Sequence, residues 1–267
     1  MGTERSTADP SPEPLDVVDR RAPAPARTTA YGPDPAQVYD VRLPRGAQRR
    51  VGVVVVHGGF WRAEYDRAHA GSQAQAFAEA GYPTAVLEYR RTGMPGGGWP
   101  GTGEDIAAGV AAVRADPHLP DRLVLVGHSA GGHLAVWAAS QPWAHGLAGA
   151  VGLAGVVDLR LAADLGLGSG AVDAFMGATP ARAPEAYAAA DPATLRPAVP
   201  VVLVHGRDDD TVPLGVSESY LEHQGGRGDA HAEVRLRPVE GCGHFGLIDP
   251  EHPGFAEVLA AVALFDS

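Results

Sequence analysis

The most constraining feature of the sequence is a glycine-flanked serine that joins an apolar run to a helix-like stretch. The run Leu123 to Val126 is typical of a buried strand, and His133 to Ala139 has the composition of a helix. Between them, Gly127-His128-Ser129-Ala130-Gly131 must turn the chain sharply, and the glycines relieve backbone crowding there. A serine in this position projects from the top of a sheet beside a helix N-terminus, as in a nucleophile elbow.

The pattern along the rest of the chain predicts alternating strands and helices. Continuously apolar runs, typical of parallel strands buried on both faces, cover 51–56, 84–89, 123–126 and 201–204. Further strands are expected at 38–43 as an antiparallel addition, at 150–154, and at 234–237 on a sheet edge. Helical patterns cover 71–80, 104–115, 133–140, 214–223 and 257–265. This alternation predicts an α/β fold with a doubly wound, mostly parallel sheet that binds its ligand at the carboxyl ends of the strands.

The length of 267 residues and the 45% hydrophobic content favour one catalytic domain. Residues 1–30 are rich in proline, alanine, arginine and acidic residues, and we expect them to form a flexible leader. The folded domain is expected over 31–267. Within it, the segment 158–198 interrupts the alternation with an Ala-, Pro- and Gly-rich insertion, which is expected to act as a small cap.

Charge and composition exclude several classes of function. The net charge of −11 argues against nucleic-acid binding, which needs clustered cations. The sequence contains no lysine, which excludes Schiff-base and Ser-Lys mechanisms. It has neither a secretory signal nor an apolar stretch that could cross a membrane, so we expect a cytoplasmic protein with no membrane partner. The sequence leaves the oligomeric state open, and a homodimer is compatible with it.

A serine nucleophile needs a base, and His244 is the best candidate. It lies in Gly241-Cys242-Gly243-His244-Phe245, just beyond the last predicted strand, where small neighbours let an imidazole reach the top of the sheet. Three rival histidines, His223, His231 and His252, lie in polar segments. The expected chain order of serine, acid and histidine agrees with this choice.

The residues alone leave the acid that orients the histidine open. Three consecutive aspartates, Asp208 to Asp210, follow the strand predicted at 201–204. Asp158 is a competitor, because it follows the strand predicted at 150–154 and its loop could also reach the histidine.

The tetrahedral intermediate of an acyl transfer needs backbone N–H groups that bind its oxyanion. One is expected from Ala130, directly after the serine, and others from Gly59 and Phe60 in the loop that follows the strand at 51–56. The aromatic side chains Trp61, Trp99 and Phe245 are candidates for the substrate pocket, although core packing explains each of them equally well.

The 11 histidines do not indicate a metal site. The spacing of His128 and His133 does not place them on one helix face, and the chain has no HExxH motif and no cysteine pair. We expect no metal and no cofactor. The single cysteine, Cys242, fits a reducing compartment and a buried packing role.

These motifs resemble the α/β-hydrolase superfamily, specifically its branch of arylformamidases (kynurenine formamidases) and small carboxylesterases. The resemblance extends from about residue 31 to the C-terminus. It rests on HGGFW at 57–61, GHSAGGHLA at 127–135, HGRDDDTVP at 205–213 and GHF at 243–245. The third motif resembles HGxxDxxVP, and this implies Asp209 as the acid, giving a triad of Ser129, Asp209 and His244.

The resemblance implies a serine hydrolase that cleaves a small ester or aryl formamide through an acyl-enzyme. Two alternatives stay open. A prolyl-oligopeptidase-type exopeptidase would need acidic groups for a peptide amine, for which Glu88 and Asp158 are the candidates. A non-catalytic protein of the same fold would be expected to lack a triad member, and here each member has a candidate.

Overall fold

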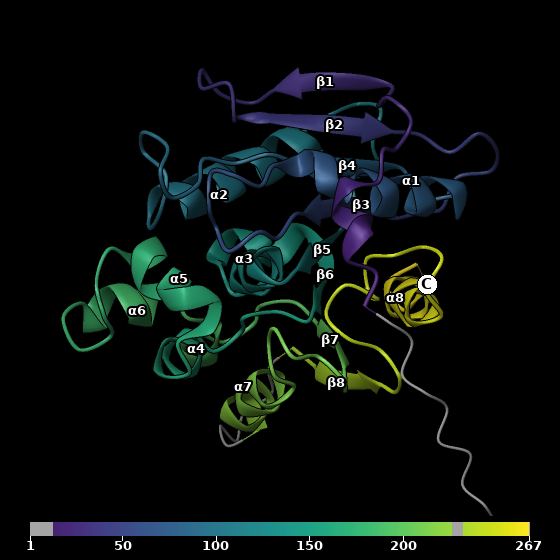
Figure 1. Cartoon of the computed structure of the whole chain (residues 1–267). Helices are drawn as coiled ribbons and strands as arrows, with labels where there is room; N and C mark the ends of the chain where they lie inside the picture. The colour runs from purple at the N-terminus through teal and green to yellow at the C-terminus, as the bar shows by residue number, and fades with distance from the viewer. Residues whose placement is uncertain (1–12, 226–231, 267) are drawn as a thin grey trace, which may run out of the picture.

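The computed structural model describes residues 13–225 and 232–266, which form an α/β sandwich around one eight-stranded sheet (Figure 1). The strand order is β1-β2-β4-β3-β5-β6-β7-β8. The strands are β1 (Arg27–Ala30), β2 (Val38–Arg42), β3 (Gly52–Val56), β4 (Thr84–Leu87), β5 (Leu123–His128), β6 (Leu147–Leu153), β7 (Val201–Gly206) and β8 (Val234–Val239).

The sheet is mostly parallel, which confirms the predicted fold class. Strands β3 to β8 pair in parallel, whereas β1 and β2 are antiparallel additions at one edge. β8 forms the opposite edge, as its alternating sequence predicts. The chain passes from β3 to β4 on one side and then to β5 on the other, so the order reverses at β3. Ligands of doubly wound sheets bind at such a switch point, beyond the carboxyl ends of the strands.

Helices cover both faces of the sheet because its central strands are apolar on both sides. Val53 and Val55 of β3 pack into a core cluster with α1 (Gly71–Glu79) and α8 (Gly254–Ala263). Val54 and Val56 face the opposite cluster, which contains side chains of α2 (Gly101–Arg114), α3 (Ala130–Ala139) and α7 (Gly215–Gly225). The alternation within one strand therefore divides the core into two layers.

The predicted leader over 1–30 is wrong for the part that the structure describes. The 3-10 helix η1 (Leu15–Asp19) contributes the fully buried Val17 to the core, and β1 pairs antiparallel with β2. The folded domain therefore begins before residue 31. The composition concealed this because η1 buries a single side chain and β1 alternates between half-buried and exposed residues. Residues 1–12 lie outside the described range.

The insertion at 158–198 is helical and lies over the carboxyl ends of the strands, beside α3 (Figure 1). It consists of α4 (Leu159–Asp164), α5 (Leu167–Met176), α6 (Pro184–Ala190) and the 3-10 helix η4 (Pro192–Thr194). Two further 3-10 helices are η2 (Arg67–Ala70) and η3 (Pro142–Gly146). Among the described residues, no helix has the length and apolar character needed to cross a membrane.

Candidate active site

Ser129 occupies a strained turn between β5 and α3. Its backbone lies in the left-handed region, with φ 55° and ψ −117°, a conformation that costs a non-glycine residue about 1–3 kcal/mol. A Cβ at Gly127 would lie 2.0 Å from the carbonyl oxygen of Gly131, and one at Gly131 would lie 2.1 Å from that of Val56. Glycine is therefore required on both sides of the serine, and the chain makes the sharp strand-to-helix turn expected from the sequence.

Backbone hydrogen bonds hold the elbow in place. The Ser129 N–H donates to the carbonyl of Leu153 at 2.9 Å, and the Ser129 carbonyl accepts from the N–H groups of His133 (3.1 Å) and Val156 (3.2 Å). Two of these partners belong to β6 and the loop after it, so the neighbouring strand supports the turn. The residue is only 4% exposed.

His244 and Asp209 lie together beyond the ends of β8 and β7. The Nδ1–H of His244 donates to Oδ2 of Asp209 at 2.7 Å. This contact fixes the tautomer and leaves Nε2 with the lone pair that can accept a proton. Ser129 and His244 line the same cavity. The structure thus brings together the three residues predicted as a triad.

Asp209 is held as a carboxylate. Burial alone would raise its pKa, but hydrogen bonds from His205 and His244 outweigh burial and lower the pKa. The backbone N–H groups of Thr211 and Val212 donate to its other oxygen at 2.9 and 2.8 Å. The negative charge can therefore stabilise an imidazolium at His244.

Asp158, the competing acid, has a different role. One of its oxygens accepts the Leu161 N–H at 2.9 Å and caps α4, and the other accepts the Ser219 hydroxyl at 2.7 Å. The only histidine paired with it among the described residues is His223, at 4.0 Å. The structure places Asp209, and not Asp158, against His244.

His128 is a site residue that the sequence motifs did not identify. Its Nε2–H donates to the backbone carbonyl of His244 at 3.0 Å, and its ring lies 4.5 Å from that of His244. Burial lowers the pKa of His128 well below its ordinary value, so the ring is neutral. The residue before Ser129 thus holds the loop that carries His244. Its position next to Ser129 was the only signal in the sequence.

The loop after β3 carries the predicted oxyanion-binding amides. Because Val56 of β3 pairs with Gly127 of β5, this loop starts beside the elbow. Gly59, Phe60 and Trp61 all have positive φ (103°, 55° and 54°), so the chain makes an unusual tight turn here. Within the described parts of the chain, the N–H groups of Gly59, Phe60 and Ala130 make no hydrogen bond to protein. Such unengaged amides can bind a developing oxyanion.

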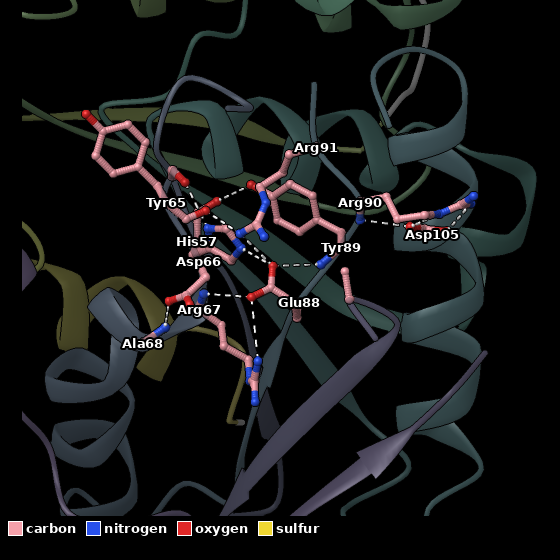
Figure 2. A network of polar contacts seen from close by, with 12 residues as sticks. His57, Tyr65, Asp66, Arg67, Ala68, Glu88, Tyr89, Arg90, Arg91 and Asp105 are labelled. Carbon is pink, nitrogen blue, oxygen red and sulfur yellow. Dashed lines mark hydrogen bonds and ion pairs between the residues drawn. The ribbon is translucent and has the colours of Figure 1, made fainter. Parts of the chain in front are cut away.

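A buried carboxylate, Glu88, anchors both ends of this loop (Figure 2). Its oxygens contact His57 Nε2 at 3.0 Å and accept the N–H of Arg67 at 2.9 Å. Arg91 contributes an ion pair at 2.8 Å, and the Tyr89 hydroxyl donates to the His57 carbonyl at 2.7 Å. Burial opposes ionisation, but the hydrogen bond from His57 and the other hydrogen bonds and charges around Glu88 together outweigh it and lower the pKa of Glu88 to about 2. Glu88 is therefore an ionised structural anchor, which the sequence could not show.

Two cavities of different size meet at Ser129. The larger, with a volume of about 190 Å³, is lined by Leu15, Val18, Gly59, Phe60, Tyr65, His69, His128, Ser129, His244 and Phe245. The smaller, about 10 Å³, is lined by Phe60, Trp61, Ser129, Ala130, Val156, Leu167, Ala171, Val172 and Val212. Three of these residues come from α5, so the insertion forms part of the smaller cavity.

The three aromatic residues predicted to line the pocket have different environments. Phe245 lines the larger cavity and Trp61 the smaller. Trp99 lines neither of them; it packs edge-to-face against Trp137 at 5.3 Å. Trp99 therefore packs in the core, which is the alternative considered for it above. The sequence carried no signal for Leu15, Val18, Tyr65 and His69, because they lie in segments without a motif.

Cys242 is buried and has the packing role expected from the sequence. Burial raises the pKa of the Cys242 thiol to about 12, so the group is a neutral packing residue. Over 13–225 and 232–266, no group of three His, Cys, Asp or Glu side chains has the arrangement of a metal site.

Comparisons with known proteins agree with this geometry. The profile of the BD-FAE family matches residues 39–223, which is more than half of the chain. No curated protein matches the chain in sequence. A truncated carbohydrate esterase from gut microbiota has a TM-score of 0.76 at 19% identity, covering 91% of this chain and 99% of its own.

Two further solved structures show the same fold. Esterase 2 of the Planctomycetes species Thermogutta terrifontis has a TM-score of 0.70 at 22% identity, with 93% and 95% of the two chains covered. Esterase B of Lactobacillus rhamnosis, inhibited by a tributyrin phosphonate, has a TM-score of 0.71 at 19% identity, covering 92% of this chain and 87% of its own. The chain therefore belongs to the BD-FAE family of esterases with the α/β-hydrolase fold.

Proposed function

We propose that the protein hydrolyses esters of a small acyl group through an acyl-enzyme at Ser129. The observation that carries the proposal is the position of the His244 imidazole. It is hydrogen-bonded to the Asp209 carboxylate at 2.7 Å, and it lines the same cavity as Ser129. A serine hydroxyl becomes a nucleophile only with such an oriented base.

The geometry supports a two-step reaction. The Ser129 oxygen bonds to the acyl carbon while its proton passes to Nε2 of His244, and the N–H groups of Phe60 and Ala130 bind the oxyanion. The ester C–O bond then breaks, and His244 returns the proton to the leaving alcohol. In the second step His244 takes a proton from water while the water oxygen bonds to the acyl carbon. The bond between that carbon and the Ser129 oxygen then breaks, His244 returns the proton to Ser129, and the carboxylic acid leaves. Asp209 stays ionised and stabilises the imidazolium.

The leaving alcohol and the acyl group are assigned to different cavities. Since His244 must protonate the leaving oxygen, the alcohol belongs in the larger cavity that His244 lines. The acyl group is then directed to the smaller cavity, beside Ala130 and Trp61. Its volume of about 10 Å³ is near the ~10–15 Å³ that holds one water. This small volume favours the smallest acyl groups, and longer acyl chains would have to displace Leu167 or Val172.

Esterified sugars are the first natural substrates to test. The carbohydrate esterase among the similar structures supports a carbohydrate alcohol, and aromatic side chains such as Phe60 and Phe245 in the larger cavity suit the apolar face of a sugar ring. An aryl formamide, as in the arylformamidase branch, is a second candidate. It is favoured by the small volume of the acyl cavity, because formyl is the smallest acyl group.

The two remaining alternatives have less support. An exopeptidase would need free acidic groups for a peptide amine, yet Glu88 and Asp158 are both bonded to neighbouring protein groups. A non-catalytic scaffold is opposed by the complete set of triad residues and by unengaged amides at the oxyanion loop.

A substrate panel tests the proposal. It comprises p-nitrophenyl formate, acetate, butyrate and hexanoate, acetylated xylose, N-formylkynurenine and Xaa-Pro anilides. We expect kcat/KM to be highest for the shortest acyl groups and to fall from acetate to hexanoate. Cleavage confined to the anilides, or activity that Ser129→Ala leaves intact, would contradict the proposal.

A further inference from the structure

We propose that the N-terminal segment, residues 13–20, is the wall of the substrate site that selects the leaving alcohol. This inference rests on the proposed function and deepens it. Leu15 and Val18 of η1 line the larger cavity together with Ser129 and His244, although more than a hundred residues separate them in sequence. The motifs around the triad give no indication that this segment takes part.

Three contacts hold the N-terminal segment against the site. At its start, Glu13 accepts the N–H of Phe245 at 3.0 Å. In its middle, Val17 is fully buried in the core cluster that contains α8. At its end, Arg20 forms an ion pair with the buried Asp249 at 2.7 Å. Two of these three contacts reach the loop that follows His244, so the position of the wall is coupled to that of the base.

Gly243 explains why Glu13 can lie so close to His244. A Cβ at residue 243 would be 1.3 Å from Oε1 of Glu13, so a larger residue there would displace this carboxylate from its position. The N-terminal segment therefore packs against Gly243, the residue before the catalytic histidine. From the sequence, the small residues around His244 were expected only to let its imidazole reach the top of the sheet.

The exposure of Leu15 indicates what the wall contacts. Its side chain is 62% exposed and lines the cavity. Large apolar side chains are usually buried, because exposure to water is unfavourable for them. Val18 is half-buried beside it. A leaving group with an apolar face, such as an aryl or sugar ring, would cover Leu15 and lie between η1 and the rings of Phe60 and Phe245. The N-terminal segment does not border the smaller cavity, so it is not expected to select the acyl group.

The test separates alcohol selection from acyl selection. Leu15→Ala and the double variant Leu15→Ala/Val18→Ala are compared with the wild type on methyl, p-nitrophenyl and 4-methylumbelliferyl acetate, and on p-nitrophenyl butyrate. Asp19→Ala is the matched control, because Asp19 is an exposed residue of the same helix that does not line the cavity. Dividing each kcat/KM by the wild-type value removes differences in intrinsic ester reactivity.

We expect kcat/KM for the two aryl acetates to fall about tenfold in the double variant, the effect of a few lost methyl contacts. Methyl acetate should change less than about twofold, and the p-nitrophenyl acetate to butyrate ratio should stay constant. Labelling of Ser129 by a small fluorophosphonate, whose leaving group is fluoride, should be unaffected and shows that the variants are folded. Equal losses on all acetates, or no loss on the aryl acetates, would overturn the inference. A wild type that neither hydrolyses esters nor takes the label would instead overturn the proposed function.

Discussion

At the residue scale, the site depends on a few side chains whose protonation or direction is set by one neighbour. His244 takes its tautomer from Asp209, and its backbone carbonyl is bound by His128. Asp209 and Asp158 were both candidates for the acid on the basis of the sequence, but they have separate roles. Asp209 accepts a hydrogen bond from His244, whereas Asp158 caps α4.

Replacing the two aspartates by asparagine should separate these roles. Asp209→Asn is expected to lower kcat by about 10⁴, because the amide favours the wrong imidazole tautomer. Asp158→Asn keeps a side chain that can cap α4, so kcat should change by less than about threefold and the free energy of unfolding by less than about 1 kcal/mol. Steady-state kinetics and urea unfolding of both variants check this. A larger loss of kcat in Asp158→Asn would reassign the acid.

Glu88→Gln tests the anchor of the oxyanion loop. The amide leaves Arg91 buried without its counter-ion, so we expect a loss of about 3 kcal/mol in the free energy of unfolding. Because the loop that carries the Phe60 amide loosens, kcat should fall about tenfold with little change in KM. Glu64→Gln, at an exposed position of the same loop, is the control and should behave as wild type. An unchanged kcat in Glu88→Gln would show that the anchor does not position the loop.

At the element scale, the elbow is the joint that fixes the strand, the nucleophile and the helix relative to one another. Its glycines are required by backbone contacts, whereas a methyl group added at Gly215, the first residue of α7, would meet no atom within 4 Å. Gly131 and Gly215 can therefore be compared directly, because a side chain would clash with the backbone at the first and would have room at the second.

Gly131→Ala should destabilise the protein by at least about 3 kcal/mol and abolish esterase activity, because the new methyl group overlaps the backbone of the oxyanion loop. Gly215→Ala should be neutral or slightly stabilising, since alanine is the better helix former. Thermal unfolding and p-nitrophenyl acetate hydrolysis of both variants measure this. Comparable stability of the two variants would mean that the turn tolerates a side chain.

Elements with a strong apolar pattern could be predicted from the sequence, and elements held by a few contacts could not. The strands β3, β4, β5 and β7 are apolar on both faces, so their position and parallel pairing followed from composition. η1 and β1 have no such pattern, because one depends on a single buried valine and the other on backbone pairing at an edge. The same limit applies to Glu88, whose partners lie on two separate segments.

At the scale of the whole molecule, buried carboxylates make stability depend on pH. The pKa of Glu88 is lowered to about 2 against its ordinary 4.5. The pKa of Asp116 is also lowered to about 2, because the hydrogen bonds from Arg27 and its other donors together outweigh the opposing effect of burial. A carboxyl group whose pKa is lowered in the folded state stabilises the protein fully at pH values above its unfolded-state pKa. This stabilisation is lost as the pH falls through the folded-state pKa.

The free energy of unfolding should therefore decrease between about pH 5 and about pH 2. Asp116→Asn should be less stable near neutral pH and show a shallower decrease, because one of the two carboxylates no longer titrates. Urea unfolding followed by tryptophan fluorescence at several pH values measures this slope. An identical slope in wild type and variant would show that Asp116 does not contribute.

The molecule as a whole thus places Ser129, His244 and the loop after β3 at the point where the strand order reverses, and borders the two cavities there with η1 and α5. The sequence predicted the first three through their motifs. It did not predict the cavities, because their volumes depend on η1, on α5 and on the packing of side chains that are distant in sequence.

The formation of an acyl-enzyme at Ser129 is the central claim, and rapid-quench mass spectrometry of the protein with p-nitrophenyl acetate tests it most directly. Wild type should release a burst of p-nitrophenol close to one equivalent and carry an acetyl group on the peptide that contains Ser129. Asp209→Asn should form the same adduct more slowly, and Ser129→Ala should form none. An acetyl group on another residue, or turnover in Ser129→Ala at the wild-type rate, would contradict the account.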